Sequence, residues 1–368
     1  MSRKHYDVLD SFRGLAAIFV AIFHLKVVGM VFEFNLIKNS YYFVEFFFVL
    51  SGFVMAHSYG NQKPCLSFAK TFIVKRIFRI YPLHFFMLCL FIPFAVANSY
   101  LGVDLGPRFS IEAFIANLLL AHALGFFEVS TWNLPSWSIS VEFYTYLLFL
   151  FLVLVKKNDI RTYFVLSVVS LIILFLFSSM GDTSRYAFFR CTYSFFLGCI
   201  AYRYSNNFKS TNIIEIMVTF CTLALLCYDV IDSNSWVAFC LPLCFFCVVL
   251  VFSKQAGMIS KFLDNRFLMF LGKISFSIYL THTLWISLFK GILLVAGKYY
   301  SLNFIVTLEG RRVIDLGLGS FNDIIYLPYL VLVILTSYIT YVHIEKRFKY
   351  PFGFSKKGLP LSSTRNQS

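Results

Sequence analysis

Long apolar runs alternate with short polar segments along almost the whole chain. The runs are roughly 20 residues long, which is the length that an α-helix needs to cross the hydrocarbon core of a bilayer. Inside lipid, a helix satisfies its backbone hydrogen bonds within its own segment. The pattern therefore predicts an all-α integral membrane protein with about ten transmembrane helices. Their expected ranges are 13–30, 42–59, 81–100, 137–155, 163–179, 186–204, 213–230, 236–252, 270–296 and 322–343.

Lysine and arginine in the polar segments indicate how these helices are oriented. Loops that carry an excess of these residues tend to face the cytosol. A further apolar stretch, at about 111–127, is short and is interrupted by His122 and Gly125. If this stretch does not cross the membrane, all of the strongly basic loops lie on one side. We therefore expect a short re-entrant or interfacial helix at about 111–127, with the N- and C-termini in the cytosol.

The composition favours a single membrane domain. Of the 368 residues, 59% are hydrophobic and only 14% are charged, which is far more apolar than a soluble domain of this length. We expect a membrane domain over residues 1–350 and a polar cytosolic tail over 351–368. The net charge of +14 lies mainly in loops beside apolar runs, where topology and membrane lipids account for it, so no nucleic-acid partner is expected.

Three ionisable residues are expected at nearly the same depth in the membrane. His24, Glu45 and Glu142 each lie about five or six residues from the outer end of a predicted helix, which places them roughly 6–9 Å below the outer boundary. A neutral imidazole can take a proton from a hydroxyl group, and a neighbouring carboxylate can orient the ring. The pattern indicates general-base chemistry. The alternative is a charge pair between His24 and Glu45 that only holds two helices together.

Three arginines lie at the expected cytosolic edge. Arg76 and Arg79 are three residues apart and share one helix face, where they suit bidentate binding of phosphate. Arg13 precedes His24 by eleven residues, or roughly 16 Å along a helix. This separation suits a ligand with an anionic head in the cytosol and a reactive end held deep in the membrane, as in an acyl-pantetheine. The alternative is ordinary boundary arginines that contact lipid headgroups.

A third histidine lies in the middle of the predicted helix at 270–296. His282 follows Tyr279 by three residues. It either lines the cavity expected around His24 or hydrogen-bonds a neighbouring helix. The nine cysteines fall mostly within apolar runs, where they are expected to act as small packing residues. No metal site is expected, because His24 and Glu45 lack clear further ligands.

Five motifs along the chain resemble, in the same order, those of the acyltransferase 3 family of integral membrane acyltransferases. They cover nearly the whole membrane region and include most of the residues selected above. The motif at 75–84 has two arginines followed by Tyr-Pro, and the motif at 44–55 has Glu45 where the family often has aspartate. The motifs are LDSFRGLAAIFVAIFH (9–24), VEFFFVLSGFVM (44–55), KRIFRIYPLH (75–84), WSISVEF (137–143) and ISFSIYLTH (274–282).

The resemblance implies a ten-helix fold in a bacterial inner membrane and transfer of acyl groups, usually acetyl, to sugars of O-antigen, peptidoglycan or related glycans. Acetyl-CoA or another acyl-CoA would be the donor, with its phosphates held by the three arginines. In the expected mechanism Glu45 orients His24, and His24 activates the acceptor hydroxyl. The residues expected to help bind the substrate are Trp137, Ser138, Glu142, Tyr279 and His282, with Trp137 stacking on a sugar.

Several alternatives stay open at this point. His24 either promotes direct attack on the thioester or carries the acyl group briefly itself. The donor is acetyl- or succinyl-CoA, and the acceptor is any of several envelope glycans. The rival class is a transporter or flippase of glycolipids without transferase activity, because a polar layer within ten helices would also serve that role. A third reading is an interaction protein whose cavity is vestigial.

Overall fold

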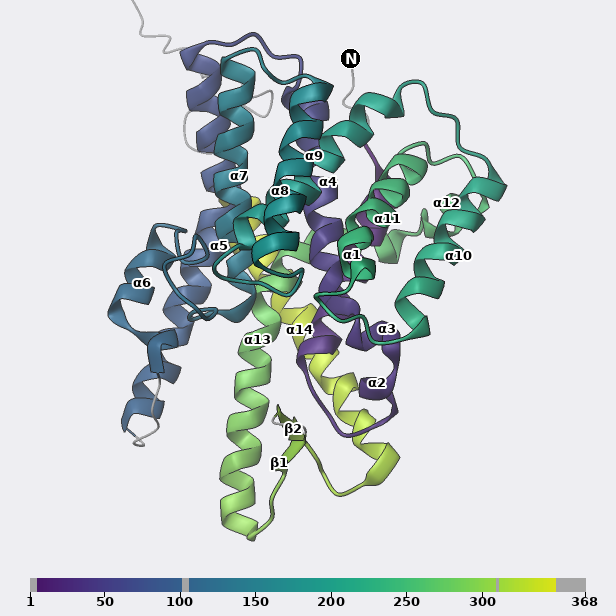
Figure 1. The fold of residues 1–368 in the computed structure, drawn as a ribbon. Coiled ribbons are helices and arrows are strands. Elements are labelled where there is room, and N and C mark those ends of the chain that lie inside the picture. The colour runs from purple at the N-terminus through teal and green to yellow at the C-terminus, as the bar shows by residue number, and fades with distance from the viewer. Residues whose placement is uncertain (1–4, 101–105, 309–310, 349–368) are drawn as a thin grey trace, which may run out of the picture.

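The computed structural model describes residues 5–100, 106–308 and 311–348 of the chain (Figure 1). The predicted tail at 351–368 lies outside the described residues. Helices of fifteen residues or more form most of the described chain, and each predicted stretch corresponds to one of them. They are α1 (Asp7–His24), α4 (Phe43–Tyr59), α5 (Leu66–Tyr100), α7 (Trp137–Leu154), α8 (Ile160–Phe177), α9 (Ala187–Ser205), α10 (Asn212–Tyr228), α11 (Trp236–Phe252), α13 (Arg266–Tyr300) and α14 (Tyr326–Thr340).

Shorter elements connect these helices. The short α-helices are α2 (Met30–Glu33), α3 (Asn35–Lys38), α6 (Ile111–Leu118), α12 (Met258–Leu263) and α15 (Lys346–Phe348). The 3₁₀ turns are η1 (Ser40–Tyr42), η2 (Gly106–Phe109), η3 (Leu134–Ser136) and η4 (Gly319–Ile325), and η5 (Tyr341–Glu345) is a short π-helix. Two antiparallel strands, β1 (Ile305–Leu308) and β2 (Arg311–Ile314), form the one sheet of the described residues.

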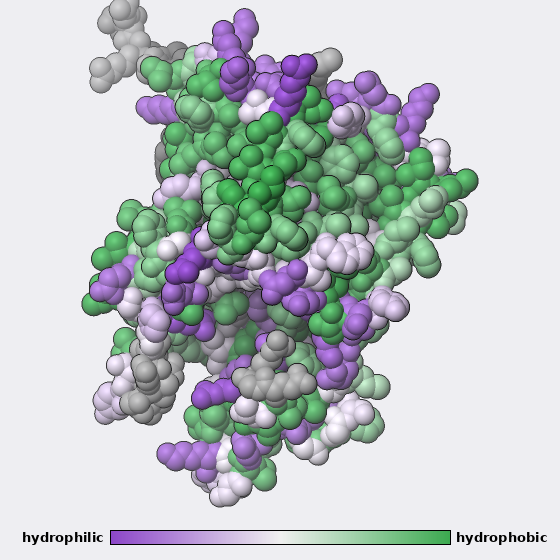
Figure 2. All heavy atoms as spheres, viewed as in Figure 1, coloured by the Kyte–Doolittle hydropathy of each residue, from purple (hydrophilic) through white to green (hydrophobic). Residues whose placement is uncertain are grey.

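The chain is a multi-pass membrane protein. Within the described residues, six helical stretches are long and apolar enough to cross a bilayer, and in four of them most of the apolar window is not buried inside the protein. They are Ser40–Tyr59, Leu66–Ala97, Leu134–Leu154, Ile160–Phe177, Arg266–Tyr300 and Gly319–Phe348. Figure 2 shows a broad apolar surface over the upper half of the molecule, with hydrophilic residues along its upper rim. The count of ten spans and the cytosolic termini stay predictions.

The segment at 111–127 contains only a short helix. Helix α6 has eight residues, or about 12 Å of helix, and the hydrocarbon core of a bilayer is about 30 Å thick. The remainder of the segment forms turns, including a positive φ of 54° at Leu120. This helix is therefore too short to cross, as the interfacial or re-entrant interpretation requires.

Two elements differ from the sequence-based expectation. Helix α5 begins at Leu66 rather than near residue 81, so the helix face that Arg76 and Arg79 share belongs to α5 itself. Lysine and arginine are good helix formers, and their long side chains reach a polar boundary from within an apolar helix. The prediction of an all-α fold also missed β1 and β2, whose β-branched residues favour extended backbone. This hairpin bonds the segment after α1: the N–H of Val28 donates to the Ile314 carbonyl at 2.9 Å.

Glycines permit two close helix crossings that position the site. Helix α1 packs on α13, where a Cβ at Gly272 would lie 2.1 Å from the Asp10 carbonyl oxygen. Helix α4 packs on α9, where a Cβ at Gly52 would lie 1.8 Å from the Phe195 carbonyl oxygen and one at Gly198 equally close to that of Val49. Small residues let helix backbones approach in this way. The crossings bring α1, α4, α9 and α13 together around the polar residues described next.

Candidate active site

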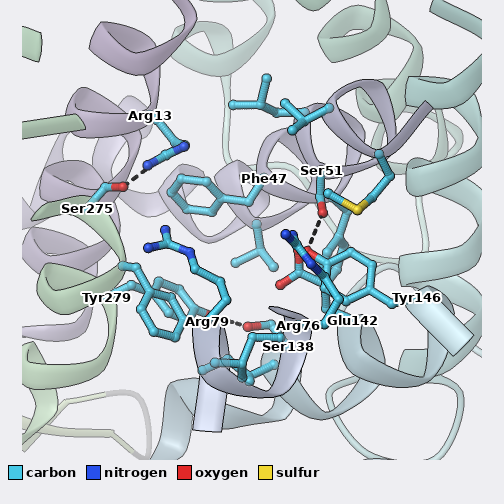
Figure 3. A pocket seen from close by; sticks show the side chains of 18 residues that line it. Arg13, Phe47, Ser51, Arg76, Arg79, Ser138, Glu142, Tyr146, Ser275 and Tyr279 are labelled. Carbon is cyan, nitrogen blue, oxygen red and sulfur yellow. Dashed lines mark hydrogen bonds between the residues drawn. The ribbon is translucent and has the colours of Figure 1, made fainter. Parts of the chain in front are cut away.

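A cavity of about 190 Å³, the inner cavity, lies among α1, α4, α5, α7 and α13. Figure 3 shows the side chains of Arg13 and Arg79 on one side of this cavity and that of Arg76 on the other. The three arginines predicted to bind a common ligand therefore face one space, although they come from two helices that are distant in sequence. The polar lining consists of Arg13, Ser51, Arg76, Arg79, Ser138, Glu142, Tyr146, Ser275 and Tyr279.

Arg76 is held between two aromatic rings. Its guanidinium carbon lies 5.7 Å from the ring centroids of both Tyr59 and Tyr146, where cation–π attraction positions it. The nitrogen Nη2 donates a long hydrogen bond of 3.5 Å to the Tyr59 hydroxyl, and the buried Nε has no hydrogen-bond partner. Among the described residues, no carboxylate forms an ion pair with Arg76. This guanidinium is therefore available for an anionic ligand.

Arg13 is more fully engaged by the protein. It pairs with Asp10 at 3.2 Å, and it donates to the Gly272 carbonyl at 2.8 Å and to the Ser275 hydroxyl at 3.0 Å. These bonds tie α1 to α13 and fix the orientation of the guanidinium. Arg13 can thus contribute charge at the wall of the inner cavity, but it has fewer free N–H groups than Arg76.

Arg79 is likewise bound to a carboxylate. Its Nη1 donates to Glu345 at 2.8 Å, and its guanidinium lies 5.3 Å from the Phe276 ring centroid. The other oxygen of Glu345 accepts from the Ser277 hydroxyl. The sequence analysis did not select Glu345, although a carboxylate directly after a predicted transmembrane helix was a usable signal.

A chain of hydrogen bonds crosses the inner cavity beside Arg76. The Tyr146 hydroxyl donates to Glu142 at 2.5 Å and is bonded to the Ser51 hydroxyl at 2.7 Å. Glu142 and Ser138 line the inner cavity rather than the outer one. Of the residues expected to help bind the substrate, Trp137 and Tyr279 line the outer cavity. Successive residues of a helix point in different directions, so one motif serves both spaces.

The outer cavity has a volume of about 830 Å³ and lies beside the C-terminal end of α1. His24, Trp137, Arg190 and Tyr279 line it, together with Leu308 and Val313 of the β-hairpin. It reaches solvent at Glu33, whose side chain is 69% exposed. This space is of a size that commonly accommodates a small organic ligand.

The backbone fixes the orientation of His24. Its Nδ1 lies 2.8 Å from the Val20 carbonyl oxygen. A carbonyl oxygen only accepts, so Nδ1 carries the proton of the neutral ring and Nε2 keeps its lone pair. His282 repeats this arrangement with the Ile278 carbonyl at 3.2 Å, and the two imidazole centroids are 4.9 Å apart. The Nε2 of His282 is buried without a partner.

Glu45 has a different partner from the one that the sequence suggested. The buried carboxylate accepts from Arg190 through Nε at 3.0 Å and Nη2 at 2.5 Å, and it accepts from the Ser194 hydroxyl at 2.6 Å. Arg190 is only 1% exposed, and a buried guanidinium requires a counter-charge. The Val20 carbonyl thus has the orienting contact with His24 that was expected of Glu45.

Arg190 was missed by the sequence analysis. It lies near the start of the predicted helix at 186–204. As an ionisable residue at membrane depth, it met the criterion that selected His24. Its guanidinium carbon lies 4.8 Å from the centroid of the Trp137 ring system, so it covers part of that indole. The pair of Glu45 and Arg190 therefore sets the position of Trp137 in the outer cavity.

A second histidine pair lies outside both cavities. The rings of His84 and His122 are parallel, with centroids 5.7 Å apart, and bind the Asn117 carbonyl and the Ser136 hydroxyl. Burial lowers the pKa of His122 to about 3, so this ring is neutral near pH 7. The pair attaches the segment around α6 to α5 and to η3, which leads into Trp137. Across the described ranges, no three residues among His, Cys, Asp and Glu come together as a metal site would require.

Comparisons with known proteins agree with the motifs. The family model described as an acyltransferase domain matches residues 6–342. O-acetyltransferase OatA of Staphylococcus aureus is 23% identical over 326 residues, which cover 76% of this chain and 50% of that protein. Protein 2 in the picA locus of Rhizobium radiobacter is 34% identical over 101 residues, covering 27% of this chain and 51% of that protein.

The similarity is partial in each case. An uncharacterized protein of Haemophilus influenzae is 30% identical over 141 residues, which cover 36% of this chain and 57% of that protein. The chain spans about half the length of the curated relatives it matches. No solved structure matches it significantly. The family model nevertheless covers almost the entire membrane region, from before the first helix to the end of α14, and the chain therefore belongs to the acyltransferase 3 family.

Proposed function

We propose that the chain is a bacterial inner-membrane O-acyltransferase that moves an acyl group from cytosolic acyl-CoA to a hydroxyl of an envelope carbohydrate. One observation carries the proposal. Arg76, which has no ion-pair partner among the described residues, lines the inner cavity, His24 lines the outer cavity, and the two cavities share Tyr279 and Val44. This arrangement matches a reaction with an anionic donor on one side and a hydroxyl acceptor on the other.

The donor would enter from the cytosolic end of α1 and α5. Phosphates of acyl-CoA would bind Arg76, with Arg13 and Arg79 adding positive charge at the cavity wall. The thioester would then extend towards Tyr279. The acetyl group is the simplest cargo, because the relative in Staphylococcus aureus is named an O-acetyltransferase and because the inner cavity is small.

His24 would act as the general base on the acceptor hydroxyl. In the direct scheme, the acceptor oxygen bonds to the thioester carbonyl carbon and the C–S bond breaks. The hydroxyl proton passes to Nε2 of His24 and then to the departing sulfur. The bond from Nδ1 to the Val20 carbonyl supports this role, because it fixes the tautomer in which Nε2 accepts the proton.

The acceptor would occupy the outer cavity. The Trp137 indole offers an apolar face on which a sugar ring packs, and the cavity volume of about 830 Å³ suits one or a few sugar residues. Glu45 and Arg190 would hold that indole in place rather than contact the reacting atoms.

A radiolabelled acyl donor distinguishes the proposed transferase from a flippase. Inverted membrane vesicles expose the cytosolic face, so radiolabelled acetyl-CoA added outside reaches the inner cavity. We expect label on glycan in vesicles that contain the chain and none in vesicles from cells without it. A flippase would move glycolipid without incorporating label. Mass spectrometry of surface glycans from a deletion strain would then identify the acceptor.

A further inference from the structure

Tyr279 lies in the wall between the two cavities. Among the described residues, it and Val44 line both. Val44 has the smaller side chain and lies in the first turn of α4, whereas Tyr279 belongs to α13 and is only 7% exposed. A thioester that moves from the inner cavity towards His24 would therefore pass beside Tyr279.

The Tyr279 side chain is held in its closed position by two contacts from other helices. Its hydroxyl is hydrogen-bonded to the Ser138 hydroxyl on α7 at 2.9 Å, as the dashed line in Figure 3 shows. Its ring packs against Phe47 on α4, with centroids 5.9 Å apart and an angle of 70° between the rings. One hydrogen bond and one ring contact make a barrier that a ligand can displace at modest cost.

The two sides of this wall differ in their access to water. The outer cavity extends to Glu33, which is largely exposed, and it carries charged and hydroxyl groups along its lining. A thioester that entered this space before a sugar had bound would meet water beside the general base. Water would then attack the carbonyl carbon, the C–S bond would break, and the proton would pass through His24 to sulfur, giving acetate and free CoA.

We infer that Tyr279 decides between transfer and hydrolysis by separating the thioester from the water of the outer cavity until an acceptor occupies it. The inference rests on the proposed function. Tyr279 is thus a positioning residue that acts on the partition of the acyl group between sugar and water. A residue needed only for packing would change the total rate or the folding yield without changing this partition.

The test measures that partition in inverted vesicles with radiolabelled acetyl-CoA. Two products are counted in each sample, namely label on glycan and label in free acetate. Tyr279→Phe keeps the ring and removes its hydrogen bond, and Ser138→Ala removes the same bond from the other side. We expect the ratio of acetate to glycan to rise about fivefold in both, because one hydrogen bond biases such an equilibrium by about that factor. Tyr279→Ala removes the ring from the wall and should raise the ratio further.

The controls separate this inference from the proposed function. Tyr299→Ala makes the same change at an 81% exposed position near the end of α13 and should leave the ratio unchanged. In the double variant Tyr279→Ala with His24→Ala, acetate release should return to background. Ratios equal to wild type in Tyr279→Phe and Ser138→Ala overturn the inference, as does acetate release that persists in the double variant. If wild-type vesicles place no label on glycan, the proposed function fails and the inference falls with it.

Discussion

Arg76 offers a quantitative test of donor binding. Replacing it with glutamine removes the charge but keeps a polar side chain of similar reach. Hydrogen bonds to charged groups contribute about 1.5–3 kcal/mol, so losing those to a CoA phosphate should raise Kd by about 10- to 150-fold. The contacts with Tyr59 and Tyr146 exist without ligand and should not add to this difference. Arg76→Lys, which keeps the charge but loses the planar guanidinium, should give an intermediate loss.

Isothermal titration of CoA into the purified chain in nanodiscs measures this loss. The wild-type affinity should weaken as salt is raised, and the glutamine variant should be less sensitive to salt, because salt screens the charge that it lacks. Lys75→Gln is the matched control, since it removes a neighbouring positive charge on the same helix that lines neither cavity. The reasoning is refuted if Arg76→Gln binds CoA as tightly as wild type, or if Lys75→Gln loses as much.

Three further predictions concern the framework of the site. Glu45→Gln leaves Arg190 buried without a counter-charge and should lower stability by about 3–5 kcal/mol, which thermal unfolding in nanodiscs would show as a large fall in Tm; an unchanged Tm would contradict the pairing. Gly52→Val should prevent the crossing of α4 and α9 and abolish monodisperse protein on size exclusion, whereas Gly291→Ala, where a Cβ meets open space, should behave as wild type. His122 has a pKa of about 3 in the fold and about 6.5 when unfolded, so the stability that it contributes is present above pH 6.5 and is lost as the pH falls below it. His122→Asn should therefore reduce the acid sensitivity of Tm, and an identical pH profile would argue against the buried neutral ring.

The sequence predicted most of the fold, because each long apolar run is a strong and local signal. It did not predict where α5 begins, since lysine and arginine are compatible with both a basic loop and the end of a helix. The hairpin of β1 and β2 was also missed, because four-residue strands carry little pattern of their own and depend on the bridge to the segment after α1.

The candidate site was only partly predictable. Depth along a helix selected His24, the arginines and Glu142, and each of them lines one of the two cavities. Depth does not specify the angle around the helix axis, so the sequence could not show that Glu45 faces Arg190 on α9 instead of His24. Nor could it show that the Val20 carbonyl binds Nδ1 of His24, because a backbone partner leaves no mark in the residue pattern.

The role of His24 as the proton acceptor is tested by His24→Ala. The variant should insert in the membrane, remain monodisperse and bind CoA with the wild-type Kd, since His24 lines the outer cavity and not the inner one. In inverted vesicles with radiolabelled acetyl-CoA, it should place no more label on glycan than vesicles that lack the chain. Glycan labelling by the alanine variant at the wild-type rate would contradict the assignment of His24 as the base.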